Sequence, residues 1–551
     1  AHRATDVTMP NSHSQRVLEV SGLTVRLPAD ADRENAIEDI ALTVEAQETL
    51  CVVGESGSGK SVTAQAVMGL LPKRQLTAVA GEIRLQGEDL LSVSSRRLRK
   101  LRGARMSMIF QEPMTALNPV IAVGRQIEEV LTTHTAMAKA ARRDRVLEVM
   151  GAVGLPEPDT LRHSYPHQLS GGQRQRVMIA MALVLEPALL IADEPTTALD
   201  VTTQAQILAL IKSIQTEHRT GVLFITHDFG VVAEIADTVA VMRAGRIVEM
   251  GPAGRILSAP EHPYTQMLMA AVPSLVPPER AARAIGAIAL ETVGLAKTYS
   301  GGGWFGKGRT VRAVHDVSIT VARGETLGIV GESGSGKSTV ARCVVRLTDP
   351  SAGRIRLQGT DIGTLSPSAM RPHRGRIQIV FQDPYRSLNP RRTVGASIVE
   401  GPLNFGVAKA EAWQRARDLL DLVGVDQAAI GRYPHQFSGG QRQRLCIARA
   451  LAMEPEILIA DEAVSALDVS VQAQVLALLE SVRDKFDLAM LFITHDLRVA
   501  AQICDRVAVM YQGEVVEIWD TGELFSDPKN AYTRQLFAAA PGRGTRFGKT
   551  L

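Results

Sequence analysis

Short apolar runs recur along this chain, and each ends at a polar or glycine-rich segment. Residues 51–53, 188–192 and 221–225 are three such runs in the first half. Uninterrupted apolar segments of this length are typical of strands buried on both faces of a parallel sheet. Residues 18–20 and 23–27 instead alternate between apolar and polar positions, which predicts strands of a half-buried sheet.

Helical patterns separate the predicted strands. Residues 62–71 and 171–186 predict helices, and residues 120–154 predict a mostly helical subdomain. Pro187 stops the second of these helices. Strands that alternate with helices in this way predict an α/β fold.

The whole pattern occurs twice. Lys337 follows Lys60 by 277 positions, and Glu462 follows Glu194 by 268. Each half has about 260 residues, enough for a core and a second small subdomain. We expect a tail over residues 1–15, a first domain over 16–275, a proline-containing linker over 276–288, a second domain over 289–541 and a tail over 542–551.

The sequence GESGSGKS stands at residues 54–61 and again, letter for letter, at 331–338. Such a loop between a strand and a helix points backbone N–H groups at phosphate oxygens, while its lysine reaches the β and γ phosphates. One copy arises by chance in about one chain in fifty of this length, so two identical copies are not accidental. The predicted nucleotide contacts are Gly54, Ser56, Gly57, Ser58, Gly59, Lys60, Ser61 and Val62, and Gly331, Ser333, Gly334, Ser335, Gly336, Lys337, Ser338 and Thr339.

Further polar residues follow the apolar runs in the same order in each half. An aspartate, with the loop serine and a glutamine, supplies oxygen ligands for Mg²⁺, and the next glutamate can accept a proton from water. A histidine at a strand end is often structural, but beside this loop and glutamate we expect a γ-phosphate contact. The predicted metal ligands are Ser61, Gln111, Asp193, Ser338, Gln382 and Asp461, and the predicted catalytic residues are Glu194, His227, Glu462 and His495.

A third motif, SGGQ, precedes a helix in each half. Its serine is a natural N-cap, and the glycines leave the first N–H groups of the helix open to an anion. An ordinary capped helix is the alternative, but the motif's place in the order favours nucleotide binding. The residues are Ser170, Gly171, Gly172 and Gln173, and Ser438, Gly439, Gly440 and Gln441.

Composition excludes several other functions. The net charge is +3 and aromatic residues make up 4% of the chain, so we expect no nucleic-acid partner. A basic run at residues 96–105 is expected to be a solvated helix face. The four cysteines form no C-x-x-C pair, so neither a zinc site nor a disulfide framework is predicted. The longest apolar stretch, 177–192, is interrupted by Glu186 and Pro187, and the polar N-terminal residues lack a secretory apolar core.

The motifs, in this order and twice, resemble those of the ATP-binding cassette ATPases. This resemblance implies two tandem P-loop domains, each with a RecA-like α/β core, an antiparallel β subdomain and a helical subdomain. It also implies that ATP and Mg²⁺ are the cofactors and that cassettes pair head to tail. The loop of Lys60 would then share its ATP with residues 438–441, and that of Lys337 with residues 170–173. Tyr299 would stack on adenine, although a surface tyrosine remains an alternative.

Finer motifs resemble the ATPase subunits of dipeptide and oligopeptide importers. They include FQEP and FQDP at residues 110–113 and 381–384, the YPHQ segments, and HPYT at 262–265. Glutathione or nickel uptake remains an alternative, and a soluble tandem cassette is a less favoured one. Residues 251–288 contain no cysteine, so no iron–sulfur cluster is predicted.

The importer resemblance also implies partners and a location. These are two transmembrane permease subunits, an extracytoplasmic solute-binding protein, and a peripheral position on the cytoplasmic face of the cell membrane. We expect the permeases to dock on the loops after Gln111 and Gln382. Phe110 and Phe381 are expected in the core, whereas Met114, Leu117, Tyr385 and Leu388 are expected to be exposed.

Overall fold

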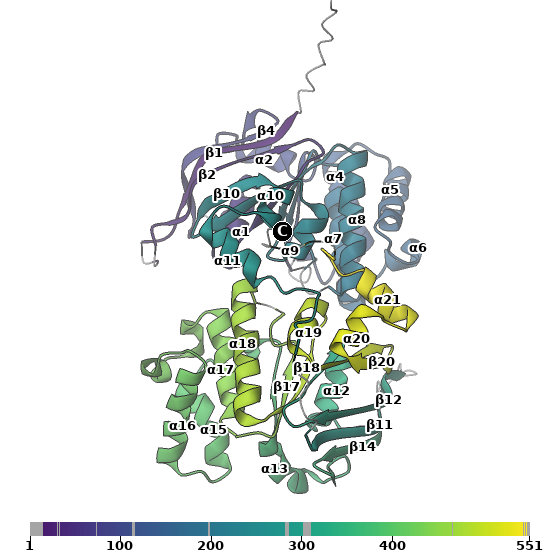
Figure 1. The fold of residues 1–551 in the computed structure, drawn as a ribbon. Helices are drawn as coiled ribbons and strands as arrows, with labels where there is room; N and C mark the ends of the chain where they lie inside the picture. The colour runs from purple at the N-terminus through teal and green to yellow at the C-terminus, as the bar shows by residue number, and fades with distance from the viewer. Residues whose placement is uncertain are drawn as a thin grey trace, which may run out of the picture. The chain divides into compact units, whose positions relative to one another are not determined.

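The structure is a computed structural model. It describes residues 15–29, 31, 33–72, 74–112, 116–196, 199–280, 286–300, 310–465, 467–543, 545 and 547. The chain divides into two compact units (Figure 1). The first comprises the described residues up to Leu199, those from Thr203 to Met269, and residues 545 and 547, and the second comprises Asp200–Thr202 and the described residues of Ala270–Arg543. Each unit contains two sheets flanked by helices, as the sequence predicts.

A six-stranded sheet forms the centre of the first unit. Its strand order is β10-β9-β3-β8-β7-β6, and every neighbouring pair is parallel except β9 and β10. All residues of β3, β7 and β8 are buried, which confirms the predicted buried strands. The strands are β3 (Thr49–Val53), β6 (Met106–Ile109), β7 (Leu189–Asp193), β8 (Gly221–Ile225), β9 (Thr238–Arg243) and β10 (Arg246–Pro252).

An antiparallel sheet in the order β2-β1-β4-β5 is the second layer of this unit. Its strands are β1 (Arg16–Arg26), β2 (Asn35–Glu45), β4 (Thr77–Leu85) and β5 (Glu88–Asp89). Leu18 and Ile37 of this layer belong to the same buried cluster as Val67 of helix α1 (Lys60–Val67) and Ile191 of β7. The helix that follows the phosphate loop is therefore fixed by both sheets.

The first unit also contains the helices that connect and cover these sheets. The expected helical subdomain contains α4 (Val123–His134) and α5 (Lys139–Ala152), and α7 ends at Leu183, three residues before the predicted end. The basic run lies largely on α2, with Arg96, Arg97, Arg99 and Lys100 exposed. The remaining helices are α2 (Ser95–Leu101), α6 (Pro158–Leu161), α7 (Gly171–Leu183), α8 (Val201–Glu217), α9 (Phe229–Ile235), α10 (Ala253–Ser258) and α11 (Pro263–Ala271).

The second unit repeats this architecture. Its sheets have the orders β12-β11-β14-β15 and β16-β17-β18-β13-β19-β20. The strands are β11 (Ile288–Ser300), β12 (Thr310–Ala322), β13 (Thr326–Val330), β14 (Ala352–Leu357), β15 (Thr360–Asp361), β16 (Ile377–Val380), β17 (Ile457–Asp461), β18 (Ala489–Ile493), β19 (Arg506–Tyr511) and β20 (Glu514–Asp520). The helices are α12 (Lys337–Val344), α13 (Pro367–Arg376), α14 (Pro384–Ser387), α15 (Val394–Asn404), α16 (Lys409–Leu422), α17 (Gly439–Leu451), α18 (Val469–Phe486), α19 (Leu497–Ile503), α20 (Thr521–Ser526) and α21 (Ala531–Ala538).

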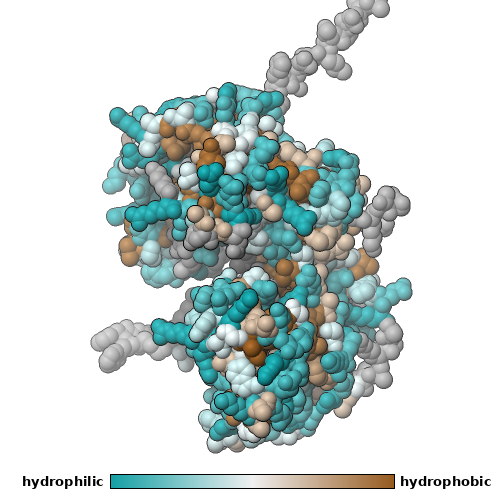
Figure 2. Space-filling model, turned by 90° about the vertical axis from the view of Figure 1, so that its left-hand side faces the viewer, coloured by the Kyte–Doolittle hydropathy of each residue, from teal (hydrophilic) through white to brown (hydrophobic). Residues whose placement is uncertain are grey.

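Hydrophilic side chains cover most of the face in Figure 2, and hydrophobic residues show there as separate small patches. Within the described residues, no helix combines the length and the apolar character needed to cross a membrane.

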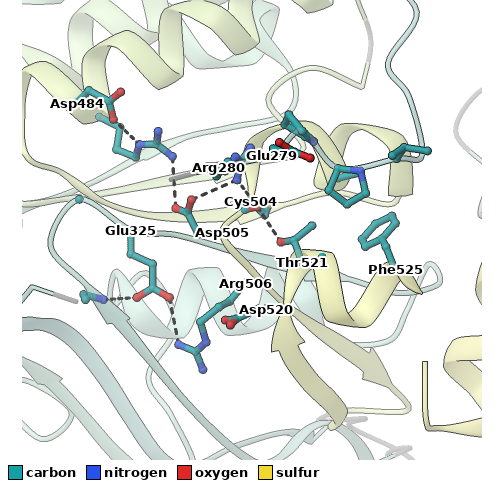
Figure 3. Close-up of a pocket in the computed structure, with 18 of the residues that line it drawn as sticks. Glu279, Arg280, Glu325, Asp484, Cys504, Asp505, Arg506, Asp520, Thr521 and Phe525 are labelled. Atoms are coloured by element: carbon teal, nitrogen blue, oxygen red, sulfur yellow. Dashed lines mark hydrogen bonds and ion pairs between the residues drawn. The ribbon is translucent and has the colours of Figure 1, made fainter. Parts of the chain in front are cut away.

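The segment before β11, residues 274–280, is attached to the rest of the second unit through Arg280. The guanidinium of Arg280 donates to the backbone carbonyls of Gln502 and Cys504 and lies 3.2 Å from the carboxylate of Asp505 (Figure 3). The side-chain amide of Gln502 donates in return to the carbonyl of Ser274, at 2.9 Å. The attached segment borders a cavity of about 1230 Å³.

The corresponding surface of the first unit has different residues. Asp237 and Asp505 are equivalent, since each accepts a hydrogen bond from the N–H of the first residue of the central strand that leads into the phosphate loop, at 2.8 Å. In the first unit, however, the ammonium of Lys212 lies 3.8 Å from Asp237, whereas the equivalent Glu480 lies 3.7 Å from Arg280. The attachment of residues 274–280 thus depends on residues particular to the second unit.

Replacing Arg280 with Ala is expected to detach this segment. Hydrogen bonds to a charged group contribute about 1.5–3 kcal/mol each, so loss of even one corresponds to roughly tenfold or more faster local opening. Amide hydrogen exchange between Ser274 and Arg280, measured by mass spectrometry, should show that acceleration. Arg323→Ala is the control, because it removes an exposed ion pair with Asp487. Equal exchange in both variants would show that Arg280 does not anchor the segment.

Candidate nucleotide-binding sites

Each phosphate loop follows a fully buried strand and approaches the neighbouring strand too closely for a side chain. Gly54 has φ of 147°, and a Cβ there would lie 2.2 Å from the carbonyl oxygen of Met242. Gly331 has φ of 151° and the same 2.2 Å approach to Met510. Only glycine fits this backbone. The loop therefore presents main chain, with its N–H groups, at the edge of the sheet.

The lysine of each loop is buried against its own backbone. Lys60 is 7% exposed and donates through Nζ to the carbonyls of Gly54 and Glu55, at 2.7 and 3.0 Å. Lys337 is 5% exposed and makes the equivalent bonds, both at 2.7 Å. Burial lowers the pKa of Lys337. Each ammonium is held at the loop, where a phosphate would gain most from its charge.

A serine and an aspartate meet beside each loop. The hydroxyl of Ser61 donates to Asp193 at 3.1 Å, and that of Ser338 to Asp461 at 2.9 Å. Burial raises the pKa of Asp193 to about 6 and raises that of Asp461, with the serine hydrogen bonds opposing the shift. A buried carboxylate next to a hydroxyl is a fitting oxygen donor set for Mg²⁺, since a cation would restore the ionised form.

The glutamate after each aspartate connects two further segments. In the first unit Gln111 donates through Nε2 to Glu194 at 2.9 Å, and Nδ1 of His227 lies 3.2 Å from the same carboxylate. In the second unit Gln382 donates to Glu462 at 2.8 Å, and Nδ1 of His495 lies 3.5 Å away. Because each glutamine uses its amide nitrogen here, its amide oxygen is the atom left for a metal ion.

The two glutamates have an unusual backbone conformation. Their φ angles are 48° for Glu194 and 51° for Glu462, in the left-handed region, which costs a residue other than glycine about 1–2 kcal/mol. Strain of this kind concentrates at functional positions. The turn aims each carboxylate at the glutamine and the histidine. The residue after each histidine, Asp228 or Asp496, caps the next helix.

Opposing effects set the protonation of Glu462 and His495 in the second unit. Burial by itself would raise the pKa of Glu462, but the hydrogen bond and charge of His495 and the charge of Lys337 hold that pKa below its usual value. Burial would lower the pKa of His495, but Glu462 raises it overall. The ionised glutamate needed by a general base is therefore favoured.

The SGGQ segments form capped helix starts that face solvent. Ser170 accepts a hydrogen bond from the N–H of Gln173 at 3.2 Å, and the Gln173 side chain accepts from the N–H of Ser170 at 3.0 Å. Ser438 and Gln441 form the same box at 3.3 and 3.0 Å. These hydrogen bonds stay within each turn and do not involve the N–H groups of the two glycines, so the helix start is preformed.

Tyr299 lies on β11 and is 40% exposed, with the ammonium of Lys297 5.1 Å from its ring centre. An exposed ring can stack on a base, but the structure leaves the alternative of a surface tyrosine open.

The structure corrects several of the expectations for the loops after the glutamines. Phe381, expected in the core, follows the end of β16 and is only half-buried. Leu117 and Leu388 are only 2% and 3% exposed, because both pack into the core instead of facing a partner. Phe110 was expected in the core but follows the end of β6 and is 40% exposed. Tyr385 is 65% exposed, as expected. Met114 lies outside the described residues.

Sequence reasoning missed two contacts, one on the second glutamine loop and one on the first phosphate loop. The ring of Tyr385 lies 3.9 Å from the guanidinium carbon of Arg442, on the SGGQ helix. The hydroxyl of Tyr264, from the HPYT segment, reaches Glu55 of the first phosphate loop. The matching ends of the two halves were a visible signal, but pattern alone does not give a partner across 209 positions.

Comparisons with known proteins show what the chain is similar to. The ABC transporter family model matches residues 37–197 and 314–465, and the model of the oligopeptide/dipeptide transporter C-terminal region matches 248–301. The glutathione import ATP-binding proteins GsiA of Salmonella typhimurium and Pectobacterium atrosepticum are both 46% identical, over 97% and 96% of this chain and 91% and 90% of theirs. A dimeric bacterial ABC transporter cassette is 27% identical, covers 43% of this chain and 98% of its own, and has a TM-score of 0.39. The chain therefore belongs to the ABC transporter family, as a tandem-cassette ATPase of the importer kind.

Proposed function

We propose that this chain hydrolyses ATP at two sites to drive the uptake of small peptides through separate membrane subunits. The observation that carries the proposal is the constellation of loop lysine, serine–aspartate pair and glutamine–glutamate–histidine cluster, complete in both units. The match of residues 248–301 to a peptide-transporter region and the similarity to glutathione import proteins support a peptide-like substrate. Dipeptides, oligopeptides and the tripeptide glutathione are all peptide-like substrates.

In this mechanism the loop N–H groups and Lys60 or Lys337 bind the β and γ phosphates. Bound Mg²⁺ would supply positive charge that offsets the charge building on the phosphates. Ser61 with Asp193, and Ser338 with Asp461, would hold it, with the oxygens of Gln111 and Gln382 as further ligands. Glu194 and Glu462 take a proton from the attacking water, and His227 and His495 orient them and contact the γ-phosphate.

We propose, from the family resemblance, that each ATP also contacts the SGGQ segment supplied by the other cassette. ATP then favours the paired state, and hydrolysis releases it, because ATP binds the two states with different affinities. The domain limits of the sequence prediction, 16–275 and 289–541, are retained in this proposal. As an importer ATPase the chain works with membrane permeases and a substrate-binding protein. We propose two permease subunits and a peripheral place at the cytoplasmic face of the membrane.

Reconstitution tests the proposal as a whole. The chain is combined in proteoliposomes with the permease subunits that co-purify with it and with their binding protein. Uptake of a labelled dipeptide, a pentapeptide, glutathione and Ni²⁺ is measured with and without ATP. ATP-dependent uptake of at least one peptide supports the proposal, and uptake of Ni²⁺ alone contradicts it.

Replacing Glu194 and Glu462 together with Gln should stop turnover but keep ATP binding. Loss of a positioned general base costs about 10²–10⁴ in rate, and the isosteric amide preserves the contacts with Gln111 and Gln382. Steady-state ATPase activity and equilibrium binding of a fluorescent ATP analogue provide the two readouts. ATPase activity near that of the parent would exclude these residues as bases.

Gly439→Asp should impair nucleotide trapping at the loop of Lys60 and spare that of Lys337. A Cβ at Gly439 meets nothing within 4 Å, so the variant should fold. Gly522→Asp is the matched control, since Gly522 also has open space around it. Photo-crosslinked nucleotide is assigned to each loop by peptide mapping. Loss at Lys337 alone would contradict the exchange of SGGQ segments.

Tyr385→Ser should reduce transport relative to ATP hydrolysis. Its exposed ring is the strongest candidate for permease contact among the described residues of the second glutamine loop. Phe486→Ser, at an exposed ring on the end of α18, is the control. The ratio of peptide transported to ATP hydrolysed, measured in proteoliposomes, should fall severalfold only for Tyr385→Ser. An unchanged ratio would remove Tyr385 from the docking surface.

A further inference from the structure

A tyrosine from the segment after each cassette reaches the phosphate loop of that same cassette. The hydroxyl oxygen of Tyr264, on α11, accepts from the N–H of Glu55 at 3.4 Å and donates to the Glu55 carboxylate at 3.1 Å. The hydroxyl of Tyr532, on α21, accepts from the N–H of Glu332 at 3.2 Å. The contact therefore occurs independently in both units.

The start of each tyrosine helix is held by a glutamate on the last strand of the central sheet. Glu249 accepts from the N–H groups of Glu261 and His262, at 2.9 and 3.1 Å. Glu517 does the same for residues 529 and 530, at 2.7 and 3.1 Å. Burial would raise the pKa of Glu517, but its polar surroundings, which include the hydrogen bonds from the two N–H groups, lower that pKa overall. An ionised carboxylate thus fixes the turn before the tyrosine.

A side chain two residues before each tyrosine then sets the helix start. Nδ1 of His262 accepts from the N–H of Tyr264 at 3.1 Å, and Oδ1 of Asn530 accepts from that of Tyr532 at 2.8 Å. His262 and Asn530 therefore accept equivalent hydrogen bonds in the two units. This explains how the second segment keeps the arrangement without the HPYT sequence.

The surroundings keep each phenol in place and protonated. Tyr264 is 4% exposed, and the guanidinium carbon of Arg243 lies 4.8 Å from its ring centre. The ring of Tyr532 lies 4.2 Å from that of Tyr511. Burial raises the pKa of Tyr264, and it raises that of Tyr532 to about 12. Each hydroxyl keeps its proton at physiological pH, so that of Tyr264 can donate to Glu55.

The tyrosine and the lysine of the phosphate loop bind the same residue from opposite sides. The N–H of Glu55 binds Tyr264, while its carbonyl accepts from Nζ of Lys60 at 3.0 Å. In the second unit Glu332 is held in the same way by Tyr532 and Lys337, the latter at 2.7 Å. A movement of the tyrosine helix therefore changes the loop backbone that receives the lysine.

We propose that Tyr264 and Tyr532 are positioning residues that hold the phosphate loops in the conformation that binds ATP. The segment after each cassette thereby sets the ATP affinity of its own cassette. This inference rests on the proposed placement of ATP at the two loops. It assigns a role at the nucleotide site to residues 248–301, which match the peptide-transporter C-terminal region and contain Tyr264.

The test removes only the hydroxyls, in the full chain, with Tyr264→Phe, Tyr532→Phe and the double variant. The ATP KM should rise about threefold to tenfold in the double variant, the factor expected for one lost hydrogen bond per site. The kcat should stay within about twofold, because the catalytic glutamates are untouched. Tyr511→Phe is the matched control, since its hydroxyl contacts Gln512 and not the loop.

A second variant separates the two bonds of Tyr264. Glu55→Ala removes the carboxylate but keeps the N–H that binds the hydroxyl, so its KM should rise less than that of Tyr264→Phe. The Tyr264→Phe/Glu55→Ala double variant should match Tyr264→Phe alone. Strictly additive effects would overturn the assignment, because they would show that the two residues act independently.

Three further outcomes are decisive. KM values equal to that of Tyr511→Phe would overturn the inference, as would a loss of folded protein seen by circular dichroism, which would make the hydroxyls part of the core. Lys60→Ala and Lys337→Ala distinguish this failure from failure of the proposed function. If both lysine variants retain parental ATPase activity, the proposed sites are wrong. If they lose it while the phenylalanine variants match the parent, only the tyrosine inference fails.

Discussion

The carboxylate that follows the buried aspartate is the group on which the geometry of each candidate site depends. Glu194 interacts with Gln111 and His227, and Glu462 interacts with the equivalent pair, so one group joins three segments that are distant in sequence. Parallel strands make this possible, because their carboxyl ends meet at one edge of the sheet. The aspartate–glutamate pair, the histidine and the phosphate loop all follow strands of that kind.

The sites concentrate buried charge, which is costly unless it is compensated. Asp193 and Asp461 have raised pKa values from burial, and Lys337 a lowered one. At the proposed sites, a magnesium nucleotide would bring a cation to the aspartates and anionic phosphates to the lysine. The arrangement therefore favours ligand binding more than it favours stability of the isolated fold. The left-handed backbone of Glu194 and Glu462 adds to this cost and fixes the direction of each carboxylate.

The two cassettes have kept the nucleotide chemistry while their surfaces have diverged. The serine–aspartate, glutamine–glutamate and tyrosine–loop contacts are present in both. The contacts of Arg280, by contrast, occur only in the second unit among the described residues. In the first unit Lys212 occupies the position of Glu480 and would repel a second cation. The charge at this position therefore differs between the two units where the segment before β11 packs.

The sequence by itself determined the family, the repeat, the order of the strands' polar ends and the residues of the phosphate loops. These features are local, since buried runs, glycine positions and caps are specified by near neighbours. Only the tertiary structure decided which polar groups meet, such as Tyr264 with Glu55 or Arg280 with Asp505. It also decided exposure, burying Leu117 and Leu388 and exposing Phe110 against expectation. The physical reason is that burial and long-range hydrogen bonds depend on how elements pack, and a linear pattern of side chains does not contain that packing.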